Sequence, residues 1–144
     1  MRHIRVILFA VLLFFVGSPL VLAKTVPEHP LIRPYPGSVL AQNMSKFQKF
    51  NAADFYVTDP ATKKRIKKTI KGKYWRLLYE VRTPSGERVR DISKLEFFEN
   101  FKAAALEKGG EVRYEGSGQL VFTVPNDEGG TTWCRVAGNA GCRI

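Results

Sequence analysis

The chain has 144 residues, of which 44% are hydrophobic and 25% are charged, and its formal net charge is +10. That length suits one modest domain with a real core. The basic charge favours anionic partners such as lipid headgroups, lipopolysaccharide or acidic polymers, and it carries no information about the fold.

The N-terminus has the layout of a secretory signal. Two arginines lie within the first five residues, and an unbroken apolar run follows over Val6–Val16. Small residues then stand at Val21 and Ala23, which predicts a signal peptide over 1–23 that is cut after Ala23. The apolar run has eleven residues, whereas a bilayer span takes about 20. We therefore expect no membrane span after cleavage.

Export defines the surroundings that we expect for the rest of the chain. Cleavage leaves 121 residues with 21 Lys and Arg against 13 Asp and Glu, a net charge of +8. We predict a periplasmic protein, peripheral to the outer membrane, whose partners are envelope proteins, anionic lipids or polymers. Nucleic acid is not expected, because an exported protein rarely meets it. The sequence does not indicate the oligomeric state.

Residues 24–45 are predicted to form an extended, proline-rich arm. Pro27, Pro30, Pro34 and Pro36 each remove a backbone donor and bias the preceding residue toward extended geometry. The arm should turn at Pro36-Gly37. A single α+β domain is expected over 46–144, and the last two residues resemble the start of a further strand, as in a chain cut short.

Two strands are predicted before the helix. Lys46–Thr58 mixes aromatic and polar residues, and a turn signal follows it at Asp59-Pro60. Arg65–Arg82 is rich in β-branched and aromatic residues and reads as one long strand. Gly72 within it marks a bulge or a close backbone approach.

A helix is predicted from Ser93 to Lys108. Ser93 and Glu96 have the spacing of a capping box, in which each side chain bonds the other's backbone N–H. An arc of apolar residues should face a sheet, and Gly109-Gly110 should end the helix. The arc comprises Leu95, Phe98, Phe101, Ala105 and Leu106.

Three short strands are predicted after the helix, over Glu111–Glu115, Gln119–Val124 and Thr131–Val136. The fold class is then α+β: an antiparallel sheet of about five strands with one amphipathic helix packed on it, in the order ββαβββ. Cys134 and Cys142 enclose seven residues. In an oxidising compartment such a pair predicts a disulfide across a terminal hairpin.

A basic run is the most unusual feature of the mature sequence. Its members are Lys63, Lys64, Arg65, Lys67, Lys68, Lys71 and Lys73. They could bind the phosphates of anionic lipid or polymer, or they could be a solvated hairpin flank that keeps an exposed edge from pairing. Nearby Tyr74, Trp75 and Tyr79 are either interfacial anchors or core residues.

No enzyme activity, cofactor or metal site is expected. The chain has no glycine-rich phosphate loop, GxSxG or HExxH motif. Its two cysteines and single mature histidine cannot readily supply four zinc ligands. A small secreted hydrolase that uses His29 stays as an alternative, although no carboxylate partner stands out.

Several segments together resemble one family. The opening motif contains His29, Pro30, Leu31, Tyr35, Pro36, Gly37 and Ser38. It is similar to the segment that follows the signal in Gram-negative OmpA-family envelope proteins. Ile70–Tyr79, Ser93–Val112 and Thr132-Trp133 resemble later segments of the same proteins in the same order.

This resemblance implies an accessory periplasmic domain with a binding or spacer role and no catalysis. In that family a separate C-terminal domain grips peptidoglycan, and the present chain lacks such a domain. The resemblance therefore assigns peptidoglycan binding to none of these residues. A stand-alone module that binds anionic envelope polymers or lipids through the basic hairpin is the alternative.

Overall fold

The computed structural model describes residues 25–138, which form seven strands, one α-helix and one short 3-10 helix. The signal peptide predicted over 1–23 and Cys142 lie outside the described residues. The elements are β1 (Ser38–Leu40), η1 (Gln42–Met44), β2 (Lys46–Thr58), β3 (Arg65–Arg76), β4 (Tyr79–Val81), α1 (Lys94–Glu107), β5 (Glu111–Gly116), β6 (Gln119–Pro125) and β7 (Thr131–Ala137). No helix within 25–138 is long and apolar enough to cross a membrane.

The fold is of the α+β class, with antiparallel strand pairs and one helix. The expected single sheet of five strands does not form. Instead the strands make three small sheets, β1-β4, β2-β3 and β5-β6-β7. The strand predicted over Arg65–Arg82 is interrupted at Leu77-Leu78, so that its end, β4, leaves β2 and pairs with β1 from the arm.

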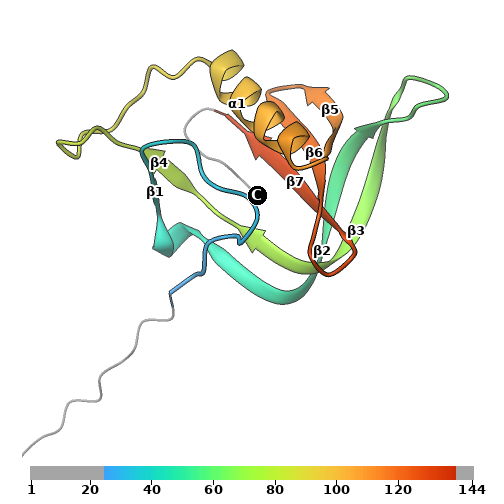
Figure 1. Ribbon diagram of the computed structural model, residues 1–144, viewed down its shortest axis with the longest axis horizontal. Coiled ribbons are helices and arrows are strands. Elements are labelled where there is room, and N and C mark those ends of the chain that lie inside the picture. Colours follow the sequence, from blue (N-terminus) through green and yellow to red (C-terminus); the bar gives the residue numbers. More distant parts are fainter. Residues whose placement is uncertain (1–24, 139–144) are drawn as a thin grey trace, which may run out of the picture.

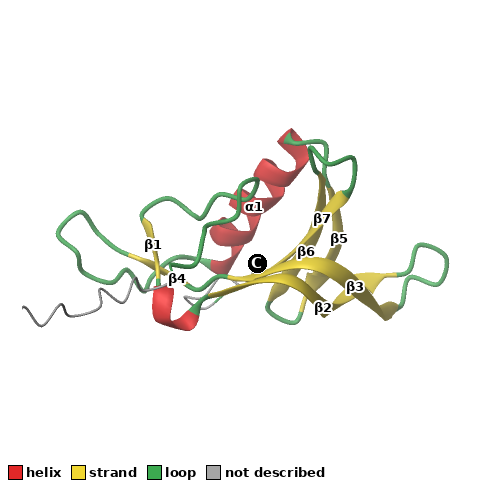
Figure 2. Cartoon of the chain, turned by 90° about the horizontal axis from the view of Figure 1, so that it is seen from below, coloured by secondary structure: helices red, strands yellow, loops and turns green. Residues whose placement is uncertain are grey.

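The β5-β6-β7 sheet lies between α1 and the β2-β3 hairpin (Figures 1 and 2). Side chains along a strand point alternately to the two faces of a sheet, so this sheet can pack against α1 with one face and against the hairpin with the other. Phe122 faces the helix and contacts Phe101 across a ring distance of 6.4 Å. On the other face Trp133 contacts Phe55 of the hairpin at 5.6 Å. The central strand β6 is therefore buried from both sides.

The hydrophobic core lies on the helix side of this sheet. It gathers residues from the arm, the β3-β4 region, α1, β6 and β7, and every member is at most 7% exposed. Its members are Ile32, Leu77, Tyr79, Phe98, Phe101, Ala105, Leu120, Phe122, Val124, Cys134 and Val136. Tyr79 is therefore a core residue rather than an interfacial anchor.

The helix is confirmed within one residue at each end, but its buried face is narrower than predicted. Phe98, Phe101 and Ala105 are buried, at the helical spacing of three and four residues. Leu95 and Leu106 are 66% and 60% exposed, so their place in the predicted arc is wrong. The helix packs on a sheet of three strands, and Phe98, Phe101 and Ala105 make up its buried face.

The two helix ends differ in how well their motifs were predicted. At the N-terminus the Ser93 side chain makes no capping bond, and Glu96 instead accepts a hydrogen bond from the Tyr35 hydroxyl. The predicted capping box is therefore wrong. At the C-terminus the N–H of Gly110 donates to Ala105 O at 2.8 Å and that of Gly109 donates to Leu106 O at 2.9 Å. With Gly109 at φ +71°, this is a Schellman ending.

The β2-β3 hairpin is long, twisted and antiparallel, and it extends beyond the rest of the molecule (Figure 1). Its register shifts between Gln48 and Asn51, where β2 holds one residue more than β3. Gly72 lies opposite Asn51 and has a φ of +155°. The bulge predicted at Gly72 is thus confirmed, and the extra residue belongs to the opposite strand.

The proline-rich arm packs against the domain and does not extend away from it. Ile32 is 5% exposed and belongs to the core. The backbone of Val26 is held by the Gln42 side chain, whose Oε1 accepts from the N–H at 2.7 Å and whose Nε2 donates to the carbonyl at 3.2 Å. The turn at Pro36-Gly37 forms as predicted, with Ser38 N–H donating to Tyr35 O.

Candidate functional site

The basic run occupies the turn and the second strand of the β2-β3 hairpin. Lys63 and Lys64 lie in the turn, where Lys63 has a left-handed φ of +58°. All seven side chains of the run are exposed. Strand geometry divides the members in β3 between two faces instead of gathering them into one cluster.

Aromatic rings and carboxylates engage several of these cations. Arg65 lies over the Tyr56 ring at 4.4 Å, and Lys68 lies over Trp133 at 4.9 Å. Within residues 25–138, only two of the seven make an ion pair. Lys67 pairs with Asp54 at 3.2 Å, and Lys73 pairs with Glu128 at 2.5 Å. Five cations are left without a carboxylate.

Asp54 is the acidic residue on the outer side of the hairpin. Its Oδ1 accepts a hydrogen bond from the Thr69 hydroxyl at 2.6 Å. This bond, together with Lys67, lowers the pKa of the Asp54 carboxyl. Asp54 therefore stays ionised, and it neutralises one lysine of the run at neutral pH.

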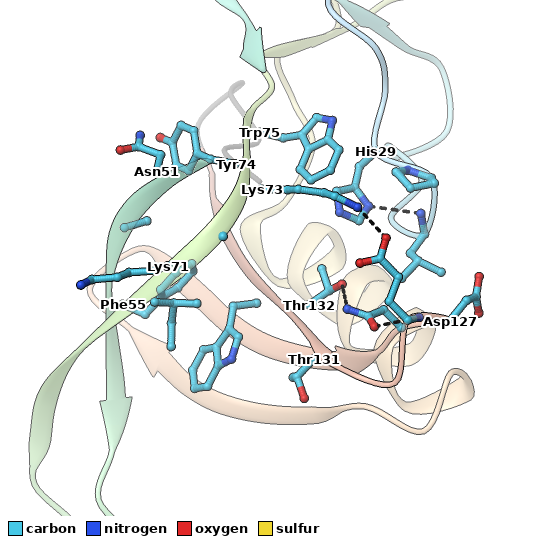
Figure 3. A pocket seen from close by; sticks show the side chains of 18 residues that line it. His29, Asn51, Phe55, Lys71, Lys73, Tyr74, Trp75, Asp127, Thr131 and Thr132 are labelled. Carbon is cyan, nitrogen blue, oxygen red and sulfur yellow. Dashed lines mark hydrogen bonds and ion pairs between the residues drawn. The ribbon is translucent and has the colours of Figure 1, made fainter. Parts of the chain in front are cut away.

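A groove of about 400 Å³ lies between the hairpin, the β6-β7 loop and the arm (Figure 3). Aromatic rings and polar side chains line it: His29, Pro30, Leu31, Asn51, Ala53, Phe55, Ile70, Lys71, Gly72, Lys73, Tyr74, Trp75, Asn126, Asp127, Glu128, Thr131, Thr132 and Trp133. Lys73 reaches across the groove, whereas the Lys71 side chain points to the other side of the hairpin (Figure 3). The Lys73–Glu128 pair thus joins β3 to the β6-β7 loop.

Trp75 packs inside the molecule at one end of this groove. Its ring meets His29 edge-on at 4.6 Å and lies 4.7 Å from Phe47. Its indole N–H is buried and has no hydrogen-bond partner within the described residues. An interfacial anchor would present that N–H to the headgroups, so Trp75 serves packing.

His29 holds the fold of the arm. It is 9% exposed, and its Nδ1 accepts hydrogen bonds from the backbone N–H of Leu31 at 3.1 Å and of Ile32 at 3.2 Å. A ring nitrogen that accepts twice is unprotonated, so the proton of the neutral ring resides on Nε2. Burial also lowers the pKa of His29. These contacts give the residue a structural role, and no carboxylate within 25–138 hydrogen-bonds its ring.

His29 should make the stability of the protein depend on pH below neutrality, because its pKa is lower in the folded chain than in the unfolded chain. Below about pH 6.5 the unfolded chain binds a proton at His29 more readily than the folded chain, in which the pKa of His29 is lowered. Stability is therefore full above that pH and falls with acidification, by at most about 1.4 kcal/mol per pH unit. Unfolding in urea at several pH values measures this slope.

His29→Asn is the matched variant for that experiment. Its Oδ1 can accept the same two backbone N–H groups, and it does not titrate. The variant should lose the fall in stability that begins as the pH drops below about 6.5, while its arm stays folded. An unchanged slope in the variant would assign the pH dependence to other groups.

The remaining predicted residues lie apart from the groove or outside the described part. Cys134 is buried in β7 at 0% exposure, and its pairing with Cys142 stays a prediction. Tyr35, Pro36, Gly37 and Ser38 of the opening motif build the turn before β1. No group of three or more metal-ligating side chains gathers within 25–138.

Sequence reasoning missed three participants. Trp133 stands in a predicted strand and a resembling segment, Phe50 stands in the predicted strand Lys46–Thr58, and Glu128 lies between two predicted strands. Phe50 is 72% exposed at the bulge. Neither its exposure nor the partners of Trp133 and Glu128 can be predicted from sequence spacing, because they depend on the hairpin's register and its packing on β7.

No family model, no curated protein and no solved structure matches this chain.

Proposed function

We propose that this chain is an exported, non-catalytic binding module of the bacterial cell envelope, of the accessory type that its sequence resembles in OmpA-family proteins. The observation that carries this proposal is the β2-β3 hairpin, which extends into solvent with five cations that have no carboxylate partner among residues 25–138. The N-terminal signal layout supports a periplasmic location at the outer membrane.

The contacts of His29 favour binding over hydrolysis. A general base needs a free nitrogen near the substrate and a partner that orients the ring. Here Nδ1 accepts two backbone bonds and the ring packs on Trp75. If the protein were a hydrolase that uses this histidine, His29→Asn would abolish turnover.

Co-sedimentation of the signal-free protein with isolated envelopes tests the proposal. We expect binding at low salt and its loss at high salt, because counter-ions screen exposed charges. Replacing Lys63, Lys64, Lys67 and Lys68 by glutamine should weaken binding by at least about 100-fold, since each basic residue near an anionic surface contributes about 1 kcal/mol.

The control variant removes four exposed charges elsewhere. Arg33, Arg90, Lys94 and Lys108 are exposed and make no ion pair within the described residues. Their replacement by glutamine should leave most of the binding intact. Equal losses in both variants would mean that net charge alone attracts the protein, and absent binding by the unmodified protein would refute the proposed function.

A further inference from the structure

The outer face of the β2-β3 hairpin is a continuous surface of its own. Phe55 and Val57 of β2 are buried against the β5-β6-β7 sheet, so the residues that alternate with them point outward. Beyond the bulge, alternation with these two residues fixes the outward side chains. Before the bulge, Phe47 and Trp75 pack inside, so the residues that alternate with them point outward. The strand register pairs Lys46 with Arg76, Gln48 with Tyr74, Ala52 with Lys71, Asp54 with Thr69, Tyr56 with Lys67, and Thr58 with Arg65.

Contacts between side chains support the shared orientation within each of these two parts of the hairpin, one on each side of the bulge. Lys67 and Thr69 of β3 both reach Asp54 of β2. Near the start of β2, Lys46 lies over the Tyr74 ring at 5.5 Å. Such cross-strand and diagonal contacts form only between side chains on the same side of a sheet.

This outer face is strongly cationic. Lys46, Arg65, Lys67, Lys71 and Arg76 face a single carboxylate, Asp54. The pairs run along the whole of β2, which has 13 residues and a length of roughly 40 Å. In the described part of the chain, Lys67 alone among these five cations makes an ion pair. An anionic partner would therefore meet a row of available cations.

The bulge adds an exposed apolar side chain to this row. Phe50 lies in the bulge itself, between Gln48 and Asn51, and is 72% exposed, the highest value among the large apolar residues in the described part of the chain. Tyr56, farther along the same face, is 37% exposed. Exposed aromatics flanked by lysine and arginine are typical of surfaces that lie on a membrane interface.

We propose that this outer face binds the surface of an anionic lipid leaflet, with the cations on the headgroup phosphates and Phe50 inserted among the acyl chains. This inference rests on the proposed envelope function and names its partner. A soluble acidic polymer would use the cations and would leave Phe50 in water. The exposed phenylalanine is therefore the feature that favours lipid.

Binding to vesicles of phosphatidylcholine with about 30% phosphatidylglycerol tests the inference. We expect Phe50→Ser to lower the partition coefficient about tenfold. Lys71→Gln combined with Arg76→Gln should lower it about 25-fold, roughly fivefold for each charge. Vesicles of phosphatidylcholine alone should bind the protein weakly.

Matched substitutions on other surfaces provide the controls. Leu95→Ser removes a side chain that is 66% exposed on α1, and Arg90→Gln with Lys108→Gln removes two exposed charges. Each should change the partition less than about twofold. Thermal unfolding of every variant verifies that it folds.

Three results would overturn the inference. The first is that the unmodified protein does not bind the anionic vesicles. The second is that Phe50→Ser and Leu95→Ser lower the partition coefficient equally. The third is that polygalacturonate competes with the vesicles for the protein, and that Phe50→Ser does not change its binding to polygalacturonate. If the protein binds isolated envelopes but fails on the vesicles, the lipid inference alone is refuted. If it binds neither, the proposed function fails as well.

Discussion

Replacing Gly110 by alanine is expected to destabilise the fold by about 3 kcal/mol or more. A Cβ at this position would lie 2.2 Å from the carbonyl oxygen of Thr123 and 2.7 Å from that of Ala105. Both atoms belong to backbone, so relief requires the end of α1 to move away from β6. Equilibrium unfolding in urea measures the loss.

Gly109→Ala is the matched control, one residue away. Gly109 has a φ of +71°, and no atom lies within 4 Å of its added Cβ. Its cost is therefore backbone strain alone, about 1–2 kcal/mol. If the two alanine variants were equally stable, the close approach of α1 to β6 at Gly110 would be wrong.

Replacing Phe101 by alanine is expected to cost about 3–5 kcal/mol, as is typical of a buried phenylalanine. Phe101 is 2% exposed and contacts the rings of Phe97 at 5.1 Å and of Phe122 at 6.4 Å. The substitution would leave a cavity between α1 and the sheet that these large rings cannot fill. The measurement is again the free energy of unfolding in urea.

Leu106→Ala should change that free energy by less than about 0.5 kcal/mol. Leu106 is 60% exposed, and alanine is the better helix former, which offsets the small loss of contact. The sequence pattern alone places both residues on the buried arc. A large loss for Leu106→Ala would restore that broader arc and contradict the observed packing.

Local features of the fold could be predicted well from the sequence. The helix and the three strands after it lie within one residue of their predicted ends. Each boundary there has its own chemical signal, such as Gly109-Gly110 after the helix. The turn at Pro36-Gly37 and the bulge at Gly72 are of the same kind, because glycine adopts the required positive φ without a Cβ clash.

Features that depend on distant partners could not be predicted. A run of apolar residues does not indicate that Leu77-Leu78 ends one strand pairing and that Tyr79 begins another with β1. The exposure of Leu95 depends on how α1 is placed on the sheet, and the helical spacing of apolar residues does not reveal that placement. Glu96 has the spacing of a capping box, but its carboxylate accepts a hydrogen bond from the Tyr35 hydroxyl of the arm instead.

In the candidate site, too, local features could be predicted from the sequence and features that depend on distant residues could not. The basic run is visible in the sequence because its residues are contiguous. Its distribution over two faces, and the addition of Lys46, Phe50 and Arg76 to one of them, follow from strand register. Register depends on the bulge and on the packing of Phe55 and Val57, which composition does not reveal.

The two hydrogen bonds between the Gln42 side chain and the Val26 backbone have a consequence for the order of cleavage and folding. If the leader is cut after Ala23, only two residues, a span of about 7 Å, separate the cut from Val26. Docking of Val26 would limit how far the chain beside the cut can be drawn into a peptidase. Maturation should therefore precede docking of the arm, and a precursor that folds early should resist processing.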